Sequence, residues 1–286
     1  MTLPDPANKS TGTIRLVVVP IAIGLPLAAL TVPAARAGFV AATLFVQWLL
    51  YAAWGWWALR TSRTLGFGTD GLFSPPTRAR DWRYALLFVP LLVLCVSALF
   101  FQIALLSYAF PGLKDALLEP SPSEPSSPLV IALLTGLTGA TLAPVVEELV
   151  FRGVLFRAWR SRFGHVRAML GTSVLFGLLH HDVIGSVIFG IVMVMLYGRT
   201  GSLLVPVVTH ALYNAVTQLF GALPDSDALT IAELRMLWAP SVIAMLSSIA
   251  LIVLVFRERN HSVAGACPQA APLAREVAAP AFTVSE

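Results

Sequence analysis

Long apolar runs constrain this chain more than any other feature of its sequence. Several of them reach the roughly 20 residues that a helix needs to cross the hydrocarbon core of a bilayer. Eight segments can be marked, at approximately 14–35, 38–59, 84–110, 129–156, 168–181, 183–197, 203–220 and 236–256. None shows the two-residue alternation of a membrane β-barrel, and a single strand in lipid would leave backbone groups unsatisfied. The sequence therefore predicts an all-α, polytopic transmembrane helix bundle of about eight spans, with the fifth and sixth short.

The composition supports lipid as the solvent for most of the chain. Hydrophobic residues make up 57% of the 286 residues and charged residues 12%, about half the charged share of a typical soluble domain. A soluble protein of this size would need far more polar surface to cover its core. The two cysteines, Cys95 and Cys267, are too few for a disulfide framework or a cysteine-rich zinc site.

Basic residues are clustered between the apolar runs, in a pattern that indicates membrane topology. They fall in the loops after the second, fourth and sixth segments and after the eighth. The clusters comprise Arg60, Arg63, Arg78, Arg80, Arg83, Arg157, Arg160, Arg162, Arg167, Arg199, Arg257 and Arg259. The opposite loops carry only three bases, Arg36, Lys114 and Arg235, beside the acids Asp115, Glu119, Glu124, Asp225, Asp227 and Glu233. Because basic loops tend to stay in the cytoplasm, both termini are predicted to be cytoplasmic, and the net charge of +4 does not indicate a nucleic-acid partner.

Composition also divides the chain into regions. We expect a cytoplasmic N-terminus at 1–13, N-terminal transmembrane helices and loops at 14–128, and a helical core at 129–220. A last loop and transmembrane helix follow at 221–256. The Ala- and Pro-rich stretch at 257–286 is predicted to be a disordered cytoplasmic tail. The first apolar run is longer than the hydrophobic region of a usual signal peptide, so we expect it to be retained.

Three polar islands interrupt the apolar segments of the helical core. They lie at 143–152, 176–181 and 209–214. Ionisable groups are costly in a membrane span, so each demands a functional or structural reason. Glu148 and Arg152 are four residues apart and are expected to pair on one helix face, whereas Glu147 lies about 100° round and can face elsewhere. His210 and Asn214 share the same four-residue spacing.

The depth of three of these groups can be estimated from the arginines at the ends of their helices. At about 1.5 Å per residue, Glu147, His180 and His210 lie roughly 15, 20 and 17 Å from the basic boundary. All three therefore fall near the middle of a core about 30 Å thick, as a shared site requires. Each alone has a structural explanation: a Glu–Arg pair can hold helices together, and a single histidine can be an interhelical contact. We assign that role to Gln47, Gln102 and Gln218. His181 and Asp182 are expected in the turn between the two short segments, and their role is open.

At these residues the chain resembles the CPBP family of intramembrane proteases, which includes CAAX prenyl protease 2 and bacteriocin-processing (Abi) proteins. The family is marked by Glu-Glu-x-x-x-Arg, Phe-x-x-x-His and His-x-x-x-Asn on successive helices. This sequence matches all three motifs, with Glu147, Glu148 and Arg152, then Phe176 and His180, then His210 and Asn214. The resemblance covers about residues 129–220, which would be the catalytic core.

The resemblance implies an endopeptidase that cleaves a peptide or protein at the membrane. Glu147 and His180 would activate a water molecule, while His210 and Asn214 would stabilise the oxyanion. Glu148, Arg152 and Phe176 would have supporting roles. Donors aimed at a developing oxyanion are effective in a dry site, which fits this depth in the bilayer.

Two alternatives remain open from the sequence. Glu147, His180 and His210 could instead ligate zinc in a metalloendopeptidase, although Asn214 suits an oxyanion hole better, and we favour a mechanism without a cofactor. The second alternative is a non-enzymatic immunity or transport protein. The composition suggests a bacterial inner membrane, where prenylated proteins are not expected. The expected partners are therefore the lipid bilayer and a membrane-associated peptide or protein substrate.

Overall fold

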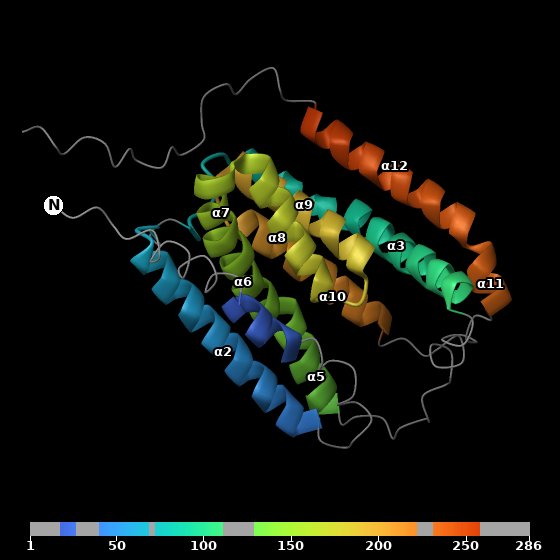
Figure 1. The fold of residues 1–286 in the computed structure, drawn as a ribbon, viewed down its shortest axis with the longest axis horizontal. Helices are drawn as coiled ribbons and strands as arrows, with labels where there is room; N and C mark the ends of the chain where they lie inside the picture. The colour runs from blue at the N-terminus through green and yellow to red at the C-terminus, as the bar shows by residue number, and fades with distance from the viewer. Residues whose placement is uncertain (1–17, 27–39, 69–71, 111–128, 222–230, 258–286) are drawn as a thin grey trace, which may run out of the picture.

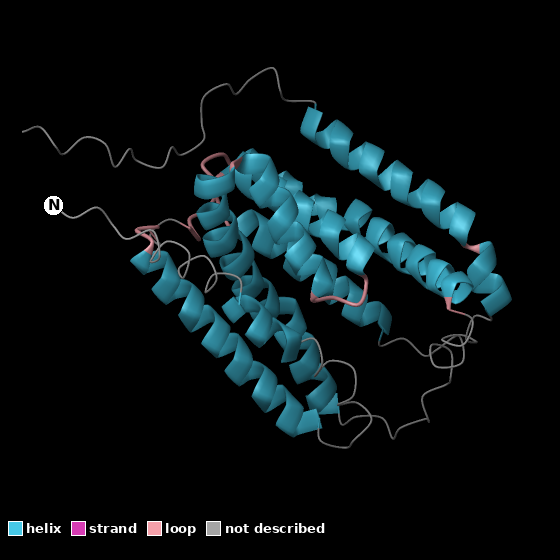
Figure 2. Ribbon diagram, in the orientation of Figure 1, coloured by secondary structure: helices cyan, strands magenta, loops and turns pink. Residues whose placement is uncertain are grey.

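The computed structural model of the chain describes residues 18–26, 40–68, 72–110, 129–221 and 231–257. Every regular element in these ranges is a helix, and no strand occurs in them (Figure 2). The predicted all-α helix bundle is thereby confirmed. The predicted N-terminal region 1–13 and the tail from 258 onwards lie outside the described residues.

The described parts of all eight apolar segments are mainly helical, but the fifth ends earlier than predicted: its helix stops at Leu178, so that Leu179, His180 and His181 lie in the turn that follows. The first is described as a helix at 18–26. The later elements are α2 (Val40–Thr64), η2 (Ala79–Leu87), α3 (Phe88–Ala109), α5 (Leu129–Leu137), η3 (Thr138–Leu142), α6 (Ala143–Glu148), η4 (Leu149–Phe156), α7 (Arg157–Phe163), α8 (His165–Leu178), α9 (Val183–Thr200), α10 (Leu204–Gly221), α11 (Ile231–Met236) and α12 (Trp238–Arg257). With 14 residues, α8 is short, as predicted, whereas α9 has 18.

The outer surface of the bundle is apolar. Four described helical stretches are long and apolar enough to cross a membrane, namely Ala79–Ala109, Leu133–Phe163, Val183–Thr200 and Trp238–Arg257. Between 22% and 44% of their most apolar windows is buried against other parts of the protein, so most of that surface needs a lipid partner. Leu86, Ile243 and Leu246 are each more than 60% exposed. These features identify an integral membrane protein, while eight crossings stay a prediction.

The helices that carry the three polar islands pack together in the middle of the fold. The α8 and α9 helices form a pair joined by a short turn, α10 packs against η3 and α6, and α2 packs against η4 (Figure 1). On the far side, α3 contacts α9 and is itself covered by α12. This arrangement surrounds α6 and η4 with helices from both halves of the chain.

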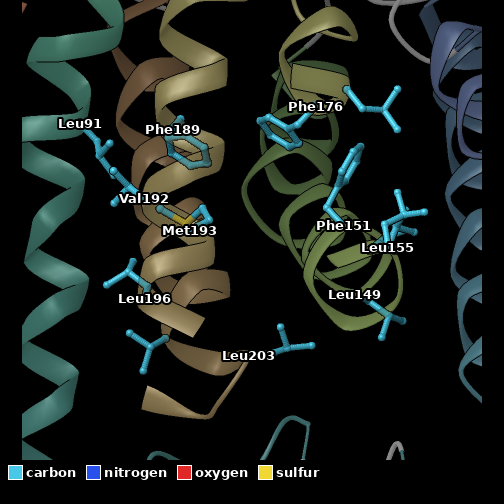
Figure 3. Packing of buried hydrophobic residues seen from close by; sticks show 14 of the residues in the cluster. Leu91, Leu149, Phe151, Leu155, Phe176, Phe189, Val192, Met193, Leu196 and Leu203 are labelled. Carbon is cyan, nitrogen blue, oxygen red and sulfur yellow. The ribbon is translucent and has the colours of Figure 1, made fainter. Parts of the chain in front are cut away.

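Aromatic side chains fill the space between these central helices. The rings of Phe151 and Phe176 meet edge to face with centroids 5.1 Å apart, and Phe176 stacks on Phe189 at 6.0 Å (Figure 3). Edge-to-face and offset stacked pairs are the favoured geometries of aromatic rings. The cluster fixes η4, α8 and α9 relative to one another immediately beside the polar islands.

The helix that contains the first polar island is not a regular α-helix. Its six α-helical residues, Ala143–Glu148, lie between two π-helical stretches, η3 and η4. Pro144 has no N–H to donate to a carbonyl one turn earlier, which accounts for a change of helical winding at this point. The widened turns set the direction in which Glu147 and Glu148 leave the helix.

Candidate active site

Glu148 and Arg152 form a fully buried ion pair. The two side chains are 0% and 1% exposed, and Nη1 of Arg152 lies 2.9 Å from Oε1 of Glu148. A second guanidinium nitrogen, Nη2, donates to the carbonyl of Gly190 on α9 at 3.1 Å, and the charge lies over the ring of Phe176. The pairing predicted from their four-residue spacing is confirmed. These contacts tie η4 to α8 and α9.

His210 is held by the same ion pair. Its Nδ1 lies 3.0 Å from Oε1 of Glu148, and the side chain is 4% exposed. An ionised carboxylate can only accept, so Nδ1 carries the proton of this hydrogen bond. The other ring nitrogen, Nε2, faces Oε2 of Glu147 at 3.9 Å.

His180 lies in the turn after α8 and is oriented by the last turn of that helix. Its Nδ1 donates to the carbonyl of Phe176 at 2.7 Å, and its ring stacks on the Phe176 ring with centroids 4.3 Å apart. The phenylalanine of the Phe-x-x-x-His motif therefore supplies both a backbone acceptor and a packing surface. Its Nε2 lies 4.0 Å from Oε2 of Glu147.

One oxygen of Glu147 is thus the meeting point of the site. Its Oε2 lies 3.9 Å from Nε2 of His210 and 4.0 Å from Nε2 of His180. The structure brings together the three groups that the depth estimate places at one level. Both distances exceed a direct hydrogen bond and suit a bridging water molecule.

Sequence reasoning missed Tyr51, which belongs to this site. Its hydroxyl donates to Oε1 of Glu147 at 3.1 Å, leaving Oε2 to face the two imidazoles. Tyr51 comes from α2, far from the three polar islands in sequence. The only local signal is that it follows Gln47 by four residues and so shares a helix face with it.

Asn214 is bound to the backbone of η3, the π-helical stretch that precedes α6. Its Nδ2 donates to the carbonyl of Gly139 in η3 at 2.8 Å. An amide nitrogen carries two hydrogens, so one N–H of Asn214 is left for another acceptor. The contact holds α10 against η3.

The turn between α8 and α9 has its own support. Asp182 caps α9 by accepting from the backbone N–H of Gly185 at 2.9 Å. Gln102 on α3 donates to the carbonyl of His181 at 2.6 Å and accepts from the N–H of Ile184 at 3.4 Å. Gln102 is thus an interhelical contact, as predicted, and it fixes the turn that follows His180.

A cavity of about 280 Å³ opens beside Glu147. It is lined by Gly24, Gln47, Tyr51, Trp54, Thr135, Thr138, Gly139, Ala143, Glu147, Phe151, Leu179, His180, His181 and Gln218. Glu147 and His180 therefore reach a space that could hold part of a substrate. His210 and Asn214 are not among the described residues of its wall.

The positions of these donors bear on the zinc alternative. Imidazole nitrogens and a carboxylate are suitable zinc ligands, but ligands around a tetrahedral zinc ion lie only about 3.4 Å apart, from bond lengths of about 2.0–2.1 Å. The corresponding separations here are 3.9 and 4.0 Å. Within the described ranges, no group of three or more His, Cys, Asp or Glu residues is placed to share a metal ion.

Comparison with known proteins bears on the same part of the chain. Residues 127–216 match the family model described as type II CAAX prenyl endopeptidase Rce1-like. The "Putative membrane peptidase YdiL" of Bacillus subtilis (strain 168) is 30% identical over 81 residues, which are 27% of this chain. The chain spans about a third of the length of this relative, 33%. No solved structure matches the chain.

The matched range contains all three polar islands, and with them Glu147, His180 and His210, whereas Tyr51 lies outside it. Residues 127–216 thus match the Rce1-like family of type II CAAX prenyl endopeptidases, and this confirms the resemblance to CPBP-family membrane proteases that the three motifs indicate.

Proposed function

We propose that this protein is an intramembrane endopeptidase in which Glu147 is the general base. The observation that carries the proposal is the position of Oε2 of Glu147, which faces Nε2 of both His180 and His210 at the edge of a cavity. A carboxylate with one oxygen held by Tyr51 and the other facing two imidazoles is placed to bind and deprotonate a water molecule.

The reaction follows from the hydrogen bonds of His180. Because its Nδ1 donates to the Phe176 carbonyl, neutral His180 has a free acceptor at Nε2. A water molecule between this nitrogen and Glu147 can donate to both while its oxygen attacks the scissile carbonyl carbon. Glu147 takes the proton and passes it to the leaving amine as the C–N bond breaks. The products are a carboxylate and an amine.

His210 and Asn214 act on the oxyanion in this proposal. To donate from Nε2, His210 must carry protons on both ring nitrogens, and Glu148 provides the acceptor that Nδ1 then requires. The second N–H of Asn214 is the other donor. Removal of one donor from such an oxyanion hole typically costs on the order of 10²-fold or more in rate.

The substrate class follows from where the site lies. Glu147 lies in α6 and His180 in the turn after α8 of an integral membrane protein, so the scissile bond must enter the bilayer. A signal-like, bacteriocin-like or other membrane-anchored peptide meets this requirement. A cavity of about 280 Å³ holds only a short stretch of a substrate polypeptide. This size favours a substrate that is extended around the scissile bond.

The decisive experiment is an activity assay on the purified full chain in detergent. Quenched fluorescent peptides with apolar anchors are incubated with the parent and with Glu147→Gln, each with and without a chelator, and the products are identified by mass spectrometry. We expect Glu147-dependent cleavage that survives the chelator. Cleavage abolished by chelation and restored by zinc would overturn the proposed mechanism in favour of the metalloendopeptidase.

A further inference from the structure

The cavity beside Glu147 has a polar wall that the proposed chemistry does not use. On α2, Gln47, Tyr51 and Trp54 all line the cavity, at spacings of four and three residues that share one helix face. Tyr51 is bound to Glu147. The amide of Gln47, by contrast, makes no hydrogen bond to a described residue. The indole Nε1 of Trp54 is buried and likewise has no partner in the described part of the chain.

A second glutamine lines the cavity from α10. Gln218 lies two turns beyond His210 and one turn beyond Asn214, so the three share a helix face. Its amide lies directly on Gly139, where a Cβ atom would overlap Nε2 of Gln218. The absence of a side chain at Gly139 therefore makes room for this amide in the cavity wall. No hydrogen bond joins it to the described residues.

Two amides that no described residue satisfies are costly in a membrane-embedded cavity unless another group binds them. A primary amide offers donors and an acceptor, which complement the N–H and C=O of a peptide unit. A helical peptide satisfies its own backbone in lipid, but the extended segment around a scissile bond does not. Such a segment needs partners of this kind from the protein.

Both glutamines lie on the same side of Glu147. The α2 helix runs from Gln47 towards Arg60 and Arg63, and α10 begins after Arg199 and ends near Gln218. The continuous helical stretch from α5 to α7 likewise runs from the cavity-lining Thr135 through Glu147 to Arg157. The start of α2, the start of α5 and the end of α10 lie towards one end of the bundle in Figure 1, and α7 lies at the other. The cavity thus extends from Glu147 away from the arginine-rich loops.

We propose that Gln47 and Gln218 form a subsite for the main chain of an extended polypeptide segment, which runs from Glu147 towards the end of the bundle opposite the arginine-rich loops. The subsite deepens the endopeptidase function and rests on it. If those loops are cytoplasmic, the segment approaches the site from the outer half of the bilayer. The ligand class is then the extended flank of an apolar-anchored peptide.

Binding can be measured without cleavage. The probe is a fluorescent peptide with an apolar anchor and an extended flank, titrated in detergent with full-length Glu147→Gln protein. Gln47→Met and Gln218→Met, each added to this background, keep side-chain length and remove the amide. We expect each to raise the Kd about 5- to 10-fold, the effect of one lost hydrogen bond in a dry site. Thr141→Val is the control: the exposed Thr141 hydroxyl donates to the carbonyl of Leu137 in its own helix, so its loss should leave the Kd unchanged.

N-methylation of the probe identifies what the amides bind. Methylation of single backbone nitrogens should weaken binding at one or two positions of the probe. In the methionine variant that lacks the glutamine bound at such a position, the same methyl group should not weaken binding further. Unchanged affinity in both methionine variants, or a loss that is the same for every methylated probe, would overturn the subsite. If a methionine variant unfolds, Gln47→Asn and Gln218→Asn keep the polarity and shorten the reach, and the same criteria apply. Because the readout is binding to a protein that lacks Glu147, it does not depend on the parent cleaving the probe.

Discussion

The hydroxyl of Tyr51 donates a hydrogen bond of 3.1 Å to Oε1 of Glu147, across the interface between α2 and α6. The bond fixes which carboxylate oxygen faces the histidines, because the other oxygen, Oε2, is the one near His180 and His210. A residue from the N-terminal part of the chain thus orients the Glu147 carboxylate in the family-matched core. Through this hydrogen bond, α2 would contribute to the active site that we propose.

Tyr51→Phe should lower kcat about tenfold or more and leave KM nearly unchanged. The variant loses one hydrogen bond to a carboxylate, an interaction of about 1.5–3 kcal/mol, and keeps the packing of the ring. The measurement is steady-state cleavage of a peptide that the parent cleaves. Tyr108→Phe is the matched control, since Tyr108 is 58% exposed at the end of α3 and should show parental kinetics. If instead KM rose about tenfold and kcat stayed unchanged, Tyr51 would be assigned to substrate binding.

Glu147→Gln should reduce peptide cleavage by on the order of 10² or more while the fold survives. The substitution keeps the size and the hydrogen-bonding capacity of the side chain and removes the basic oxygen. Because it also removes a charge from the bilayer, thermal unfolding in detergent should occur at or above the parental temperature. Full cleavage by this variant would contradict the catalytic assignment and most of the case for a peptidase.

Glu148→Gln should destabilise the protein and have its main effect on folding. Arg152 is 1% exposed and would keep its charge without its carboxylate partner, a loss of about 3 kcal/mol or more. Glutamine retains an oxygen that can accept from His210, so the effect of the lost charge is isolated. Unfolding in a mixed-detergent titration measures the change.

The double variant Glu148→Gln, Arg152→Met provides the control for that experiment. Removing both charges should recover much of the lost stability, because a buried ion pair can be replaced by apolar groups at little cost. A double variant that is less stable than the single one would show that Arg152 stabilises the fold mainly through Gly190 and Phe176, which it also contacts.

Reporter fusions at Arg63, at Arg162 and after Arg259 should report cytoplasm, and fusions near Ser123 and Asp227 should report the outside. The reason is the concentration of arginines in the first group of loops. Ser123, Asp227 and Arg259 lie outside the described residues, so the experiment also extends the topology beyond them. An external signal at Arg162 would reverse the orientation of the bundle and the side from which we propose that a substrate enters.

The sequence by itself determined the solvent, the helices and the polar islands. Apolar runs of about 20 residues can satisfy their backbone in lipid only as helices, so the fold class followed from length and hydropathy. Pairs four residues apart on one helix, such as Glu148 and Arg152, also followed, because helical geometry alone brings them together. The common depth of Glu147 and the two histidines followed from a rise per residue that hardly varies.

Only the tertiary structure decided what lies across from each helix. The partners of Glu147 and of Asn214, which are Tyr51 and the carbonyl of Gly139, come from different helices. Such contacts depend on the rotation of each helix about its own axis and on its tilt relative to its neighbours. A nearly uniform apolar sequence leaves both angles undetermined. The π-helical turns around α6 change the helix face on which later residues lie, which a constant period of 3.6 residues does not anticipate. Side-chain packing between helices fixed these angles, and with them the wall of the cavity.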